Sequence, residues 1–94
     1  MTNDTPITKK VIIRNKLGLH IRAAAKLVDV ANQYPAKINI RYQNEIFNGK
    51  SIMNLMMLAA KQGTELELIA SGEHAAESLS ALKSLIDNHF GEDE

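Results

Sequence analysis

Residues 15–22 read Asn15-Lys16-Leu17-Gly18-Leu19-His20-Ile21-Arg22, and they join an apolar segment to a stretch with helical spacing. The first backbone N–H groups of a helix have no partner inside it, and the helix dipole adds partial positive charge there. A phosphate at that point therefore finds donors already in place. The sequence predicts a histidine nitrogen beside an anion site, with the Arg22 guanidinium close by.

Seven elements are predicted around this stretch. Alternating or continuous apolar runs of short length predict strands at 8–14, 36–42, 45–48 and 65–70. Apolar residues that recur every three to four positions predict helices at 21–33, 51–61 and 73–90. Pro35 ends the first helix, Ser51 is placed as the N-cap of the second, and Gly91 is placed as the stop of the third.

The strands show one apolar face at most, so a single sheet covered by helices on one side is the economical packing. We therefore predict an α+β fold for one domain over residues 1–94 with the order βαββαβα. A chain of this size buries a modest core without disulfides, and it has no cysteine.

Composition narrows the function classes. Eleven basic and eleven acidic residues cancel, which argues against a partner held by bulk charge, such as duplex nucleic acid. The acidic ending, Glu92-Asp93-Glu94, is interpreted as a solvated tail. Residues 1–6 lack the features of a secretory signal, and no apolar run is long enough to cross a bilayer, so a cytoplasmic location is expected.

Three parts of the chain together resemble the HPr family of histidine-containing phosphocarriers in the bacterial phosphoenolpyruvate-dependent phosphotransferase system. They are residues 15–22 around His20, the run Gly49-Lys50-Ser51-Ile52-Met53, and Gly63. The resemblance covers residues 8–90. It implies an open-faced β-sandwich, with a four-stranded antiparallel sheet and three helices on one face.

By this resemblance His20 is the phosphoacceptor, which receives a phosphoryl group on Nδ1 from enzyme I and passes it to an enzyme IIA protein. Arg22 stabilises the phosphate. The resemblance implies a carrier without independent turnover. We also expect a monomer without a cofactor, and the three dispersed histidines, without carboxylates at ligand spacing, do not favour a metal site. His74 and His89, near the start and the end of the last helix, are expected to be solvated.

The alternative from the residues alone is that His20 is a polar capping residue. Two positions depart from the family pattern, because Ile21 and Ala23 stand where alanine and proline are usual.

Ser51 and the helix after it are the second candidate region. Ser51 has an ordinary role as a helix cap, and the matching serine of many Gram-positive HPr proteins is phosphorylated by a regulatory kinase. Residues 52–60 are apolar around more than one face, which leaves Ile52, Met53 and Met56 as a candidate partner-binding patch. The alternative is that these methionines fill the core.

Two other functions stay open beside the carrier. One is a regulatory HPr paralogue of the nitrogen-related branch, whose phosphorylation state controls partner binding. The other is a small nucleic-acid-binding domain, but two Phe, two Tyr and zero net charge speak against it.

Overall fold

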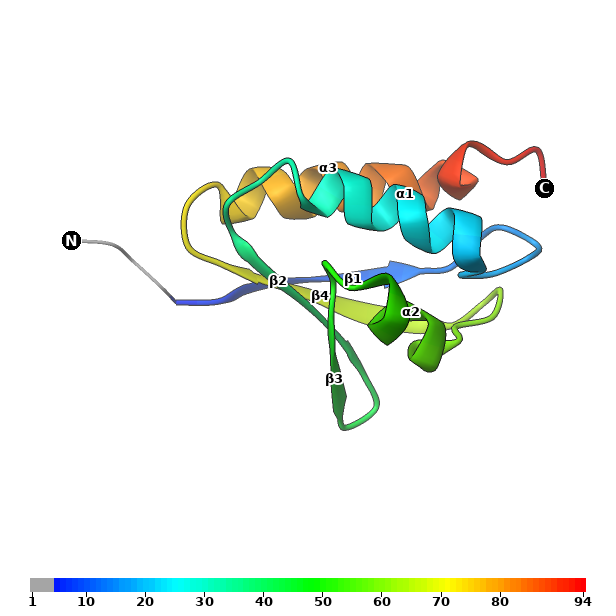
Figure 1. The fold of residues 1–94 in the computed structure, drawn as a ribbon, viewed down its shortest axis with the longest axis horizontal. Helices are drawn as coiled ribbons and strands as arrows, with labels where there is room; N and C mark the ends of the chain where they lie inside the picture. The colour runs from blue at the N-terminus through cyan, green and yellow to red at the C-terminus, as the bar shows by residue number, and fades with distance from the viewer. Residues whose placement is uncertain (1–4) are drawn as a thin grey trace.

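The computed structural model describes residues 5–94, so the first four residues, part of the segment examined for a secretory signal, lie outside it. Four strands and three α-helices form in the predicted order and end in a short 3₁₀ helix, η1 (Figure 1). The strands are β1 (Ile7–Ile12), β2 (Lys37–Tyr42), β3 (Glu45–Asn48) and β4 (Glu65–Ser71). The helices are α1 (Ile21–Ala31), α2 (Ile52–Leu58), α3 (Ala75–Asp87) and η1 (His89–Gly91).

One antiparallel sheet with the strand order β1-β4-β2-β3 forms one layer of the domain. β4 lies between β1 and β2, and its register places Leu68 opposite both Lys9 and Ile40. The alternation predicted for residues 36–42 is confirmed on β2, where Ile38 and Ile40 are buried. The period of two turns these side chains towards one face of the sheet.

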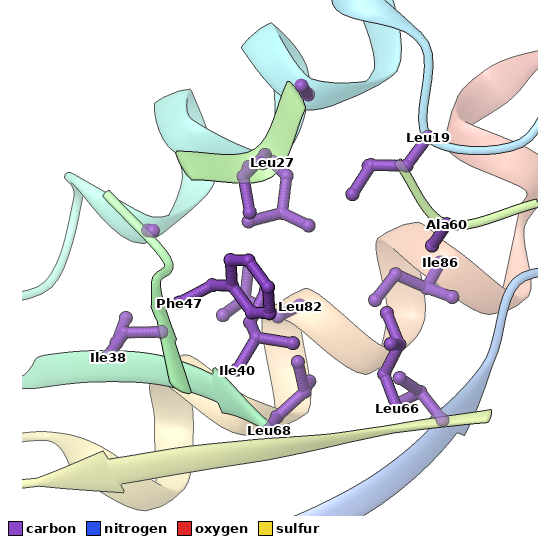
Figure 2. Packing of buried hydrophobic residues seen from close by; sticks show 14 of the residues in the cluster. Leu19, Leu27, Ile38, Ile40, Phe47, Ala60, Leu66, Leu68, Leu82 and Ile86 are labelled. Atoms are coloured by element: carbon purple, nitrogen blue, oxygen red, sulfur yellow. The ribbon is translucent and has the colours of Figure 1, made fainter. Parts of the chain in front are cut away.

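The helices close that face. Figure 1 shows α1 and α3 side by side along the sheet, and α2 contacts both α1 and β3. Figure 2 shows side chains from both layers meeting, with Phe47 over Ile40 and Leu82, and with Ile86 near Leu66. The fold class predicted from the sequence, an open sheet with three helices, is therefore confirmed.

All three helices end earlier than predicted, and α1 ends at Ala31 and not at residue 33. The second helix ends at Leu58 and not at residue 61, because Ala59 takes a left-handed conformation with φ 52° and its N–H bonds to the Leu55 carbonyl. The third helix ends at Asp87, three residues short of Phe90. His89 and Phe90 are left-handed, with φ values of 58° and 55°. None of the helices in residues 5–94 has the length and apolar character required to span a membrane.

Candidate functional site

His20 occupies the N-cap position of α1 with extended backbone angles, φ −74° and ψ 175°. Its carbonyl accepts the first helical hydrogen bond, from the Ala24 N–H at 2.8 Å. Its side chain makes no capping hydrogen bond, so the interpretation of His20 as a capping residue is wrong. The N–H groups of Ile21, Arg22 and Ala23 are the first three of the helix and have no helical acceptor. They lie where the sequence predicts an anion site, and that site stays a prediction.

The loop before His20 is held by close backbone contacts with residue 60. Gly18 is left-handed, with φ 70°, and a Cβ atom at this position would lie 2.6 Å from the Ala60 carbonyl oxygen. The next residue, Leu19, donates its N–H to that same carbonyl at 2.8 Å and packs its side chain into the core (Figure 2). Close packing of the loop against residue 60 therefore sets where His20 stands.

Arg22 and Lys16 supply positive charge beside the ring. They line an open pocket of about 290 Å³ together with Leu17, His20 and residues 92–94. Arg22 is exposed, and its guanidinium forms no hydrogen bond or ion pair with residues 5–94. A guanidinium fork binds phosphate oxygens through two parallel N–H bonds.

The C-terminal tail completes the site. Glu92 accepts a hydrogen bond from His20 Nε2 through one carboxylate oxygen and from Asn15 Nδ2, at 2.9 Å, through the other. The side chains of His20 and Glu92 are 25% and 19% exposed. Glu92 was therefore interpreted wrongly as part of a solvated tail. Sequence reasoning missed it because its partners lie 72 and 77 residues away.

The electrostatics of Glu92 follow from these contacts. Burial is the largest single effect and disfavours the ionised form, but the hydrogen bonds from His20 and Asn15, together with nearby positive charge from His20, hold the pKa of Glu92 below its usual value. The charge of Lys26 acts in the same direction. Glu92 is therefore a carboxylate at neutral pH, and it faces the ring as an acceptor only.

Ser51 is the N-cap of α2, as predicted. Its Oγ accepts the Asn54 N–H at 3.1 Å, and the Asn54 side-chain amide lies at the same distance from it. Ile52 and Met53 are exposed, by 39% and 74%. Met56 differs from the expected patch, because it is half-buried and packs against the core. Its neighbour Met57 is 72% exposed and was not foreseen.

The other two histidines lie outside the site. His74 is exposed at the start of α3 and bonds through Nδ1 to the Glu77 carboxylate at 2.8 Å. This contact raises the pKa of His74, and burial opposes it only weakly. His89 is half-buried, although both histidines were expected to be solvated.

Comparisons with known proteins identify the family of this chain. A family model for the PTS HPr component phosphorylation site matches residues 7–88. The chain belongs to the HPr family. A phosphocarrier protein HPr from Pseudomonas aeruginosa is 51% identical over 86 residues, which cover 90% of this chain and 96% of that relative. One from Pseudomonas putida is 46% identical over 87 residues, which cover 92% and 97%.

Solved structures show the same fold. The crystal structure of an HPr from Thermoanaerobacter tengcongensis superimposes with a TM-score of 0.90 at 38% identity, covering 94% of this chain and 99% of that one. An HPr from Bacillus anthracis gives 0.84 at 35% identity, covering 88% and 99%. This chain is thus a member of the HPr phosphocarrier family of the phosphotransferase system.

Proposed function

We propose that this HPr-family chain accepts a phosphoryl group from enzyme I on His20 Nδ1 and passes it to an enzyme IIA protein in the cytoplasm. One observation carries the proposal: His20 is the N-cap residue of α1, and its side chain lines one pocket with the Arg22 guanidinium, which has no partner among residues 5–94. The N–H groups at the start of this helix and the guanidinium offset the two or so negative charges of an arriving phosphoryl group. The backbone N–H groups are fixed by the helix before the reaction, so this part of the site needs little reorganisation.

The chemistry is a group transfer between proteins and not a turnover reaction. The bond between phosphorus and the donor breaks as the Nδ1 lone pair forms a new bond to phosphorus. In the second step, an acceptor group on the IIA protein takes the phosphoryl group and returns the electron pair to Nδ1. The chain ends each cycle unchanged, which is the behaviour of a carrier.

Incubation with enzyme I, Mg²⁺ and labelled phosphoenolpyruvate tests the proposal. The wild-type chain should gain acid-labile label, and H20A should gain none. H74A is a matched control, because His74 is also the N-cap of a helix and also bonds to a carboxylate. Retained labelling of H20A, or loss of labelling in H74A alone, would overturn the assignment to His20.

The acceptor protein separates the general carrier from the regulatory paralogue. Labelled chain is mixed with a sugar-specific IIA protein or with a nitrogen-type IIA protein, and the rate at which label leaves His20 is measured. Rapid discharge to the sugar-specific protein supports a general carrier. Discharge only to the nitrogen-type protein supports the regulatory function.

A further inference from the structure

The C-terminal tail returns to the start of α1 through a tightly built reversal. His89, Phe90 and Gly91 are all left-handed, with φ values of 58°, 55° and 79°. Non-glycine residues enter this region only at a cost, so surrounding contacts must hold them there. Phe90 is fully buried in the core, and the Lys26 ammonium group on α1 donates a hydrogen bond to the Phe90 carbonyl at 2.7 Å. Figure 1 shows the tail ending beside the loop that precedes α1.

The reversal brings one carboxylate to a fixed position. The Glu92 N–H bonds to the His89 carbonyl at 2.9 Å, and the Lys16 N–H bonds to the Glu94 carbonyl at 3.0 Å. Between these backbone contacts the Glu92 side chain accepts from Asn15, which is fully buried. Asn15 also donates to the Gly18 carbonyl at 2.7 Å. The amide therefore ties the tail to the loop that carries His20.

This arrangement selects one form of the ring. A neutral imidazole has one nitrogen that donates and one that carries a lone pair, and the partner of the first decides which is which. An ionised carboxylate only accepts, so the nitrogen that faces Glu92 must carry the proton. That nitrogen is Nε2. In residues 5–94 no hydrogen bond is formed by Nδ1, which is left with the lone pair.

We propose that Glu92 is a positioning residue, which holds the Nε2 proton of His20 so that Nδ1 is the nucleophile in phosphoryl transfer. The inference rests on the proposed function. It adds a residue that acts through the ring and does not itself touch phosphorus. A carboxylate that orients a histidine in this way, and stabilises the charge that develops on it, is a recurrent arrangement at sites of group transfer.

The contact between Glu92 and His20 Nε2 assists both the phosphorylation of His20 and the onward transfer of the phosphoryl group. When Nδ1 bonds to phosphorus and the donor bond breaks, the Nε2 proton stays, so the phosphorylated ring carries a positive charge. The Glu92 carboxylate lies against that charge and offsets it. When the phosphoryl group leaves, the electron pair returns to Nδ1 and again no proton has to move. A protonated ring is also the better leaving group, so the contact favours onward transfer.

The charges around the pair fit this role. Arg22 and Lys16 face the pocket, and Lys26 lies close enough to act on Glu92. Glu94 is exposed and pairs with Lys16 at 3.7 Å, while Asp93 is exposed beside it. Glu92 is the acidic residue of the tail whose side chain is mostly covered. The Glu92 carboxylate therefore faces the His20 ring, whereas the side chains of Asp93 and Glu94 face solvent.

Nitrogen and proton NMR on the full-length ¹⁵N-labelled chain tests the inference without any phosphoryl donor. In its neutral form, the wild-type ring should show a single Nε2–H tautomer, with a downfield Nε2 proton that exchanges slowly with water. E92Q should lose the slow proton and show a mixture of tautomers. D93N is the matched control, since it removes one charge from the next position and Asp93 makes no hydrogen bond to His20 among residues 5–94.

Rapid-quench phosphorylation by enzyme I gives the second readout. E92Q should be labelled on His20 about tenfold more slowly than wild type, the low end of the loss found when the hydrogen-bond partner of a metal-binding histidine is removed. A slow Nε2 proton that persists in E92Q, an unchanged rate, or a faster rate would each overturn the role of Glu92. Failure of the proposed function looks different, because the wild-type chain itself would then remain unlabelled.

Discussion

Replacing Gly18 by alanine tests whether the loop before His20 is held by close backbone packing. The added Cβ would lie 2.6 Å from the Ala60 carbonyl oxygen and 3.1 Å from the Lys61 Cα, and both obstacles are backbone atoms. The left-handed conformation, with φ 70°, adds about 1–2 kcal/mol for a residue with a Cβ. Forcing a methyl group into occupied space adds about 1–3 kcal/mol. G18A should therefore lower the free energy of unfolding by about 2–5 kcal/mol.

Gly63 offers a control with the same backbone penalty and no clash. It is also left-handed, with φ 89°, but a Cβ there would meet no atom within 4 Å. G63A should cost about 1–2 kcal/mol, so the difference between the two variants isolates the packing of the loop.

Urea denaturation followed by circular dichroism gives the free energy of unfolding of each variant from its midpoint and slope. G18A should unfold at clearly lower urea than G63A with the same slope. G18A should also be phosphorylated more slowly under folding conditions. The His20 N–H bonds to the Gly18 carbonyl at 2.9 Å, so a displaced residue 18 would shift His20 as well. Equal midpoints for G18A and G63A would refute the claim that close backbone packing holds this loop.

Three further predictions concern the surface and the pH dependence. M53E should weaken binding to enzyme I or a IIA protein, measured by titration calorimetry. Because Met53 is 74% exposed, the free energy of unfolding should change by no more than about 0.5 kcal/mol. Loss of folding would assign Met53 to the core. S51A should lower the free energy of unfolding by about 1 kcal/mol in urea denaturation, because the hydrogen bond to the Asn54 N–H is lost. Incubation with an HPr serine kinase, followed by mass spectrometry, shows whether Ser51 is also a substrate. Folding lowers the pKa of Glu92, so its contribution to stability is present above its ordinary pKa of 4.5 and is lost as pH falls through the lower pKa of the folded state. E92Q should therefore flatten the acid side of the plot of unfolding free energy against pH. An unchanged plot would contradict this.

Most of the fold could be predicted from local sequence patterns. The alternation on β2 and the spacing of Leu27 and Val28 on α1 each determine which face of an element is apolar. The apolar faces of the sheet and the helix are buried by packing against each other. The position of His20 could be predicted for the same reason, since it depends on where a loop ends and a helix begins. Ser51 is equally local, because its partner is three residues away.

The tail could not be predicted in this way. Its path depends on left-handed residues at His89 and Phe90, a conformation that a bulky residue such as phenylalanine rarely adopts, and on a core site for Phe90 supplied by distant elements. Glu92 also resembles the other acidic residues around it until its partners are known. A glycine at residue 91 after a buried aromatic residue was the one available signal that the chain turns there.

The placement of the two ends of the domain has a practical consequence for experiments on this chain. β1 begins at Ile7, opposite Ala70, and runs towards the loop that holds His20, so additions before it enter at the far end of the sheet (Figure 1). Additions after Glu94 enter beside the ring, where the last backbone carbonyl pairs with Lys16. An affinity tag should therefore be attached at the N-terminus, and kinetic data from a C-terminally tagged chain should be compared with those from an untagged one.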